Sequence, residues 1–236
     1  MENFWIVAVF AFAFFCQSVF GFGGVAIAFS ILGFFVEAKE IIFLGFIFSA
    51  FTKMIVFATD RRRVDFRVVC KIIFLIIPGL LLGAYFLKNL SSPIIAKFFA
   101  AFLILFSAQN LFLKNLKFPK FFNRIFLFFS GFAQGIFGTG GPFLFLGTKD
   151  IFKNKSQFRA SIAAIFLLAD AIRGAQYFWQ KTFDFTQIAN FWWGFPAIFV
   201  AVILGGKVHF KISENFFRVG ISILVFISGV LLFLKN

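Results

Sequence analysis

Long apolar stretches bounded by charged residues are the feature that most limits how this chain can fold. Ile72–Leu87 and Val219–Leu234 each run without a charge and approach the ~20 residues that a helix needs to cross a bilayer. Across the chain, 61% of residues are hydrophobic and only 14% are charged, whereas soluble domains carry about a quarter charged residues. The sequence therefore predicts an all-α polytopic membrane protein, with the lipid bilayer as its surroundings.

The net charge of +14 raises nucleic acid as a partner, but the placement of the basic residues argues against it. They lie in short segments between apolar stretches, as topology-determining residues of membrane proteins do. They do not gather on one face or stripe, as they do in a nucleic-acid-binding protein. We therefore expect no nucleic-acid partner.

One motif occurs twice in the chain. Gln-x-x-Phe-Gly-x-Gly-Gly spans residues 17–24 and residues 134–141, a spacing of 117, and is followed at nearly the same spacing by an Asp and a Pro in each copy. Landmarks that recur in one order at one spacing indicate an internal duplication. We predict a first transmembrane repeat at 1–118 and a second at 119–236, together forming one membrane domain.

Each predicted repeat contains one apolar segment broken by glycines and three further apolar segments. The segments are 4–36 (broken near 21–24), 41–59, 68–87, 94–113, 125–148 (broken near 138–142), 160–180, 187–206 and 215–234. Each Gly costs about 1 kcal/mol relative to Ala inside a helix, and Pro142 lacks a backbone N–H. Unwound backbone at membrane depth is tolerated only where protein buries it or where it lines a wet cavity.

Charge asymmetry indicates how the second broken segment is placed. If it turns back as a hairpin, sixteen Lys and Arg residues lie on one side of the membrane and five on the other; if it crosses, the split is nearly even. The positive-inside rule favours the hairpin. The same shape in the first broken segment gives two inverted repeats, each a Gly-broken re-entrant or helical hairpin plus three transmembrane helices, with both termini outside. The charges do not distinguish a hairpin from a full crossing in the first segment.

At the paired Gly-x-Gly-Gly motifs, the chain resembles the sulfite exporter TauE/SafE family of membrane permeases. The resemblance also covers the length, the number of segments, Asp65 and Asp184, and a mid-segment Pro at 78 and 196. It implies a secondary transporter, usually an exporter, of sulfite or a related sulfur oxyanion or organosulfonate. It also implies coupling to an ion gradient, of protons or sodium, and residence in the cell inner (cytoplasmic) membrane. The first motif departs from the family pattern, with Val25 where a small residue is usual.

The two helix breaks are the candidate substrate site. A broken helix presents backbone N–H groups and the positive end of a helix dipole, which suit an anion. With inverted repeats, the two hairpin tips would meet near the midplane of the membrane. The candidate substrate-binding residues are Gln17, Ser18, Gly21, Gly23, Gly24, Gln134, Gly138, Thr139, Gly140, Gly141 and Arg173. The alternative is that the glycines only allow close helix packing.

Three ionisable residues lie inside apolar segments: Lys53, Asp170 and Arg173. Such residues are expensive in a bilayer and are functional candidates for that reason. Asp170 and Lys53 are candidates for ion coupling, and Arg173 for contact with the anion. Two structural alternatives stay open. Asp170 and Arg173, three residues apart on one helical face, would only neutralise each other, and Lys53 would snorkel toward the interface near Arg61.

The remaining polar residues predict no catalytic or metal chemistry. Asp65 and Asp184 lie at segment ends, where caps are expected, and His209 falls in a basic loop. Cys16 and Cys70 are expected to be buried small hydrophobic residues. No cluster has the spacing of metal ligands and no Gly-x-Ser-x-Gly motif occurs, so we expect no metal, no cofactor and no enzyme activity.

Two further functions stay open beside the export of a sulfur oxyanion. One is a transporter or channel for another small anion, such as a carboxylate. The other is a non-catalytic membrane subunit that only scaffolds a complex, which would not account for paired helix breaks beside polar residues. The sequence also leaves open whether copies of the chain associate with one another.

Overall fold

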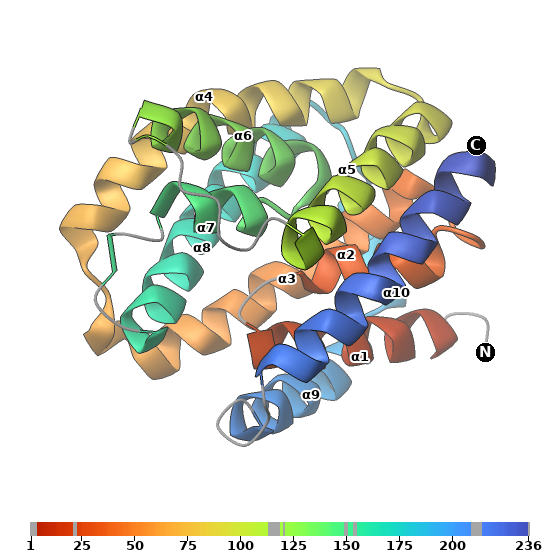
Figure 1. Cartoon of the computed structure of the whole chain (residues 1–236). Coiled ribbons are helices and arrows are strands. Elements are labelled where there is room, and N and C mark those ends of the chain that lie inside the picture. Colours follow the sequence, from red (N-terminus) through yellow and green to blue (C-terminus); the bar gives the residue numbers. More distant parts are fainter. Residues whose placement is uncertain are drawn as a thin grey trace. The chain divides into compact units, whose positions relative to one another are not determined.

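Helices account for almost all of the described chain in the computed structural model, and no strand occurs in that part (Figure 1). The structure describes residues 4–20, 23–112, 119, 121–148, 151–152, 155–208 and 214–235. The helices are α1 (Phe4–Phe20), α2 (Gly24–Leu32), α3 (Ala38–Asp60), η1 (Arg61–Arg63), α4 (Phe66–Asn89), α5 (Ser92–Phe112), α6 (Phe121–Phe137), α7 (Gly141–Thr148), α8 (Lys155–Trp179), η2 (Phe185–Asn190), α9 (Gly194–Val208) and α10 (Glu214–Lys235).

Several of these helices have the length and composition of membrane spans. In the described part, three are long and apolar enough to cross a bilayer: Ala38–Arg63, Phe66–Asn89 and Ala160–Trp179. Shorter apolar helices accompany them at Phe4–Val19, Ser92–Ala108, Phe121–Phe137, Gly194–Val208 and Val225–Lys235. The predicted all-α polytopic membrane protein is confirmed, while the inverted relation between the repeats stays a prediction.

The chain folds into two compact units, and each unit takes helices from both halves of the sequence. Unit 1 comprises Met1–Gly45, Leu90–Lys117 and Gln187–Asn236, and unit 2 comprises Phe46–Asn89 and Phe118–Thr186. Helix α3 contributes its beginning to unit 1 and its remainder to unit 2. The repeats predicted from the sequence, 1–118 and 119–236, describe a duplication rather than compact units and stay a prediction.

In unit 1 the first broken segment is a hairpin. A Cβ at Gly24, where α2 begins, would lie 2.7 Å from the Gln17 Oε1 of α1. The rings of Trp5, near the start of α1, and Phe35, just beyond the end of α2, are 5.8 Å apart. Helix α2 therefore runs back along α1, which gives the first segment the hairpin shape that the charges alone left open.

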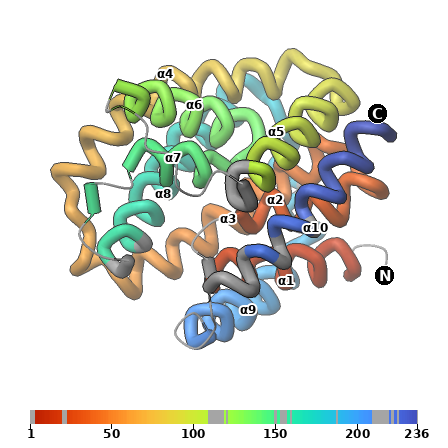
Figure 2. The backbone as a smooth tube through the Cα atoms, viewed as in Figure 1, coloured from red at the N-terminus to blue at the C-terminus, as the bar shows by residue number. Residues whose placement is uncertain are grey.

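The other helices of unit 1 pack on this hairpin and on each other. Ser18 donates a 2.7 Å hydrogen bond to the Val202 carbonyl, and Phe4 stacks on Trp193, so α1 and α9 run in the same direction. Helices α5 and α10 lie side by side (Figure 2), in close contact near Gly229, where a Cβ would lie 3.1 Å from the Cβ of Leu103.

In unit 2 the second broken segment is also a hairpin. Ser130 of α6 donates a hydrogen bond to the Gly140 carbonyl at the break. Near the far end of α7, Gly147 lies against Asn123 and Leu127, close to the beginning of α6. Helix α7 therefore runs back along α6, as the positive-inside argument predicts for this segment.

A seam of four glycines joins α4 to α6 in unit 2. Cβ atoms at Gly79 and Gly83 of α4 would overlap the carbonyl oxygens of Phe128 and Phe132, and Cβ atoms at Gly131 and Gly135 of α6 would overlap the carbonyl oxygens of Ile76 and Leu80. A later residue of α4 contacts a later residue of α6, so α4 and α6 run parallel. Small residues let transmembrane backbones approach this closely. The packing interpretation of membrane glycines thus applies to this seam.

One predicted segment begins later than expected. Residues 187–193 were included in the segment 187–206, but helix α9 begins at Gly194, and the 3-10 helix η2 and a turn precede it. Pro196 therefore lies in the first turn of α9, where its missing N–H removes no helical hydrogen bond. Pro78, its counterpart in the other repeat, lies inside α4.

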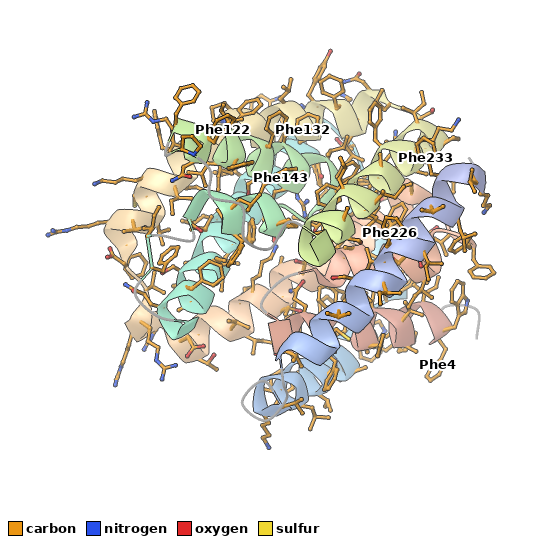
Figure 3. All side chains as sticks on the ribbon, in the orientation of Figure 1. Phe4, Phe122, Phe132, Phe143, Phe226 and Phe233 are labelled. Atoms are coloured by element: carbon orange, nitrogen blue, oxygen red, sulfur yellow. The ribbon has the colours of Figure 1, made fainter. Side chains whose placement is uncertain are left out.

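Large apolar side chains cover the outward faces of the helices (Figure 3). Phe4, Phe122 and Phe233 are all exposed, as expected for surfaces that face lipid rather than water. Cys16 is buried, as predicted, but Cys70 is exposed. The prediction for Cys70 is wrong because the residue lies near the start of α4 on the outer surface of the unit, where no described helix covers it.

The glycine seam leads to a stability prediction. We expect Gly79→Ala to lower the free energy of unfolding by about 1–3 kcal/mol, the usual effect of overpacking, because the new methyl group meets backbone that cannot yield. Thermal unfolding in detergent, followed by tryptophan fluorescence, measures the loss.

Gly45→Ala is the matched control. It lies in helix α3, and its Cβ would meet side chains rather than backbone, Val25 at 3.2 Å and Phe10 at 3.7 Å. Ala is the better helix former, so this variant should unfold at or above the temperature of the unsubstituted chain. Equal stability of the two variants would show that the seam is not tightly packed.

Candidate functional site

Each Gly-rich motif is held by the side chain of its own Gln. The Gln17 Oε1 accepts a 3.0 Å hydrogen bond from the Gly24 N–H, and the Gln134 Oε1 accepts one of the same length from the Gly140 N–H. Backbone N–H groups at the start of a helix have no partner within that helix. The two Gln side chains provide that partner, so their carbonyl groups shape the breaks.

Each break contains a glycine in a left-handed conformation, although not at the same motif position: Gly23 directly precedes α2 and Gly138 directly follows α6. Gly23 has φ +97° and Gly138 has φ +75°, a region that residues with a Cβ rarely enter. At Gly138 the surroundings add a second restriction, because a Cβ there would lie 2.8 Å from the Arg173 Nη1. The break at 138 is therefore shaped to lie directly against a guanidinium group.

A buried cluster of charges lies beside this second break, entirely within unit 2. The Asp170 carboxylate of α8 contacts Lys53 Nζ at 2.5 Å and accepts a 2.8 Å hydrogen bond from the Gln134 Nε2. Arg173, one turn further along α8, places its Nη2 3.3 Å from Asp170 Oδ1. Asp170, itself on α8, thus contacts Lys53 of α3, Gln134 of α6 and Arg173 of its own helix.

The guanidinium of Arg173 is enclosed but incompletely bonded. Its Nη1 donates to the Gln134 carbonyl, and its Cζ lies 4.8 Å from the centre of the Phe46 ring and 5.5 Å from that of Tyr177. The side chain is 0% exposed, yet no described residue accepts a hydrogen bond from its Nε or Nη2. Nη2 is near Asp170 but lacks hydrogen-bond geometry. A buried donor without an acceptor is unusual enough to require an explanation.

The cluster contains two basic side chains and one carboxylate. With Lys53 and Arg173 protonated and Asp170 ionised, two cations share one carboxylate in a site that is almost completely buried. Each ion that leaves water incurs several kcal/mol of desolvation, which only close partners recover. In that state one positive charge lacks a counterion among the described residues, and the donors without an acceptor are Nε and Nη2 of Arg173.

Lys53 and Asp170 occupy corresponding positions of the two predicted repeats. They lie 117 residues apart, the same spacing as the two Gly-rich motifs. Positions that correspond in the two repeats thus form the central ion pair. In an assembly with two-fold symmetry, a residue contacts its own equivalent only near the axis.

The structure bears on some of the roles that the sequence predicts for individual residues and not on others. Lys53 does not snorkel toward the interface, because its ammonium pairs with Asp170 and the residue is 7% exposed. Asp170 and Arg173 do not simply neutralise each other, since Lys53 is the closer partner. Ser18 bonds to α9, and Gly21 lies outside the described residues. The two hairpin tips belong to different units, and their predicted meeting stays a prediction.

The caps were identified correctly from the sequence. Asp65 Oδ1 accepts hydrogen bonds from the N–H groups of Arg67 and Val68 at the start of α4. Asp184 Oδ1 accepts from the hydroxyl and the N–H of Thr186, and these bonds lower the pKa of Asp184. Both aspartates have structural roles at helix starts.

Other members of the site had no distinctive sequence signal. Tyr177, which hydrogen-bonds to the Gly135 carbonyl, and Phe46, which covers the Arg173 guanidinium, look like ordinary apolar-segment residues. Tyr177 follows Arg173 by four residues, so helical spacing places them on one face. Only that spacing could have drawn attention to Tyr177, and nothing comparable marks Phe46.

Comparison with known proteins identifies the family. The model of the sulfite exporter TauE/SafE family matches residues 6–232, nearly the whole chain. The chain belongs to the sulfite exporter TauE/SafE family. TauE/SafE proteins are membrane transporters rather than enzymes, so the resemblance seen in the paired motifs is confirmed at the level of the family. Searches of curated proteins and of solved structures gave no significant match.

The charge count predicts an asymmetry between two substitutions in this TauE/SafE chain. Asp170→Asn leaves two buried cations without a carboxylate, so we expect a loss of about 3–5 kcal/mol, as for other broken buried pairs. Lys53→Met leaves Asp170 with Arg173 and Gln134 and removes the excess charge, so its loss should be smaller. Thermal unfolding of both variants in the same detergent gives the comparison. A larger loss for Lys53→Met would show that the excess positive charge is not a burden on the fold.

Proposed function

We propose that this protein is a secondary transporter of small anions, an exporter of sulfite or a related sulfur oxyanion or organosulfonate, and that Arg173 binds the anion. The unbonded edge of the Arg173 guanidinium is the observation that carries the proposal. Nε–H and Nη2–H point the same way and form a pair of parallel donors that match two oxygen atoms of an oxyanion. Family membership supplies the substrate class.

The surroundings of Arg173 favour an anion at this edge. The buried cluster has one positive charge in excess, and α7 begins at Gly141, three residues after the Gly138 that lies against the guanidinium. The N-terminal end of a helix adds a favourable field for negative charge. Gln134 and Thr139, both buried, are uncharged, and the Asp170 carboxylate lies beside the same guanidinium, so the anion would be held by one guanidinium against a competing carboxylate and could still be released.

A transport cycle follows from the burial of the site. Since Arg173 is 0% exposed, an anion reaches it only after part of the protein moves. Opening first to one side of the membrane and then to the other is the alternating access of secondary transporters with repeats. In this proposal the termini are outside, and the membrane is the cell inner membrane.

In this proposal Asp170 couples the binding of a proton to the binding of the anion. Its carboxylate shares Arg173 Nη2 with any bound anion, so carboxylate and anion compete for one donor. A proton on Asp170 would remove that competitor and leave the guanidinium to the anion. Binding of the proton and binding of the anion would then favour each other reciprocally.

The anion-binding role of Arg173 predicts a loss of flux. We expect Arg173→Gln to lower the uptake of labelled sulfite into proteoliposomes roughly a hundredfold, because two hydrogen bonds to a charged ligand are removed. Arg173→Lys should also fail to restore the full rate, since an ammonium lacks the parallel pair of donors. Arg67→Gln, at an exposed position at the start of α4, is the matched control and should transport normally.

The outcomes separate the candidate functions. Arg173→Gln leaves the Lys53–Asp170 pair intact, so the variant should fold, which thermal unfolding checks. Normal sulfite flux in this variant would refute the role of Arg173. Flux of acetate or formate without flux of sulfite would favour the second candidate, a carboxylate transporter, because the same pair of donors fits a carboxylate. If the folded protein transported no small anion, only the function as a scaffold subunit would remain as a candidate.

The coupling role of Asp170 predicts a separate pattern. Asp170→Asn resembles the protonated state, so we expect it to exchange labelled for unlabelled sulfite across the membrane but to lose accumulation driven by a pH gradient. Bound sulfite should also raise the unfolding temperature of this variant more than that of the unsubstituted protein, because it neutralises an otherwise unpaired cation. Retention of gradient-driven accumulation by Asp170→Asn would assign coupling to another group.

A further inference from the structure

A groove of about 540 Å³ opens on the outer surface of unit 2, away from the buried cluster. It is lined by Cys70, Lys71, Phe74 and Leu75 of α4 and by Arg124 of α6. Because α4 and α6 run parallel along the glycine seam, both helices begin at the same end of the unit. The groove lies at that end, so it places one cation from each helix beside apolar side chains.

No described carboxylate neutralises the two cations that border the groove. Lys71 and Arg124 are both exposed, and in the described part of the chain neither forms an ion pair. The described aspartates of unit 2 are engaged elsewhere: Asp60 pairs with Arg63, Asp65 caps α4, Asp170 belongs to the buried cluster, and Asp184 bonds to Thr186. The groove is therefore bordered by two basic side chains that pair with no carboxylate among the described residues.

The apolar part of the groove indicates what kind of anion fits. Phe74 is 76% exposed and stands one turn along α4 from Lys71, and Phe66 and Phe121 at the starts of the two helices are exposed as well. In a transmembrane helix such side chains face acyl chains. A soluble anion would gain nothing from them, whereas a phospholipid presents a phosphate and an acyl chain together.

We propose that this groove binds an anionic glycerophospholipid, with its phosphate against Lys71 and Arg124 and an acyl chain along Phe74 and Leu75. Basic pockets between transmembrane helices at the cytoplasmic face bind anionic headgroups. Lys71 and Arg124 both belong to the sixteen basic residues that the sequence places on that side. The proposal is independent of the transported anion and of Arg173.

Native mass spectrometry of the full chain, released from detergent with added phosphatidylglycerol or phosphatidylcholine, tests the proposal. Phosphatidylglycerol should bind in preference to phosphatidylcholine. Lys71→Gln combined with Arg124→Gln should weaken phosphatidylglycerol binding roughly thirty-fold, since each basic residue near an anionic surface contributes about 1 kcal/mol. Arg61→Gln combined with Arg62→Gln removes the same charge from η1, outside the groove, and should leave the preference intact.

Cys70 supplies a second measurement at the groove itself. It is exposed, whereas Cys16 is buried, so a water-soluble maleimide should modify Cys70 selectively in detergent. Phosphatidylglycerol should slow that modification, and phosphatidylcholine and inorganic phosphate should not.

Three results would overturn the proposal. Equal weakening in both double variants would show that the lipid responds only to net charge. Protection of Cys70 by inorganic phosphate would identify a site for soluble anions. Unchanged phosphatidylglycerol binding after loss of Lys71 and Arg124 would place the lipid elsewhere.

Discussion

The ionic contact between Asp170 and Lys53 is the constraint on which the rest of unit 2 depends. A carboxylate and two cations are held in surroundings where each would be prohibitively costly alone. Asp170 is the only described carboxylate that touches them, and it binds α3 through Lys53, α6 through Gln134 and α8 through Arg173. The positions of three helices and of the second break are therefore tied to one side chain.

The hairpins rest on a simpler principle, since each break must satisfy its own backbone. Gln17 and Gln134 do so by accepting from the glycine N–H near the start of the returning helix. The second Gln also uses its amide nitrogen to reach Asp170. One side chain thus links the shape of the break to the charge cluster, and the anion proposed at Arg173 would be bound next to both. The predicted contact of this Gln with substrate stays a prediction, and in the structure its amide bonds to Gly140 and Asp170.

Much of this arrangement was predictable because it follows from local patterns. Apolar length predicted the helices, the Gly-x-Gly-Gly motifs predicted both breaks to within a residue, and the positive-inside rule predicted that 125–148 turns back. The predicted start of α9 was wrong because Trp192 and Trp193 are apolar residues in a turn. Hydropathy does not distinguish a turn from a helix. The pairing of Lys53 with Asp170 is a contact between residues far apart in the sequence, which local patterns do not predict. Lys53 lies eight residues before Arg61, and a lysine so placed snorkels toward the interface only when no buried carboxylate lies nearer.

The predicted duplication would account for the asymmetry of the charge cluster. Lys53 and Asp170 occupy corresponding positions in the predicted repeats. Two identical charges at these positions would repel each other if they met near a two-fold axis. Opposite charges form an ion pair there instead. Arg173 corresponds to Val56 at the same spacing, so the additional cation belongs to one repeat alone. Among the described residues, every buried charged side chain lies in unit 2, and unit 1 buries only uncharged polar groups such as Ser18 and Ser30. Two hairpins of similar shape therefore carry different chemistry, and among the described residues only the second break lies against a buried guanidinium.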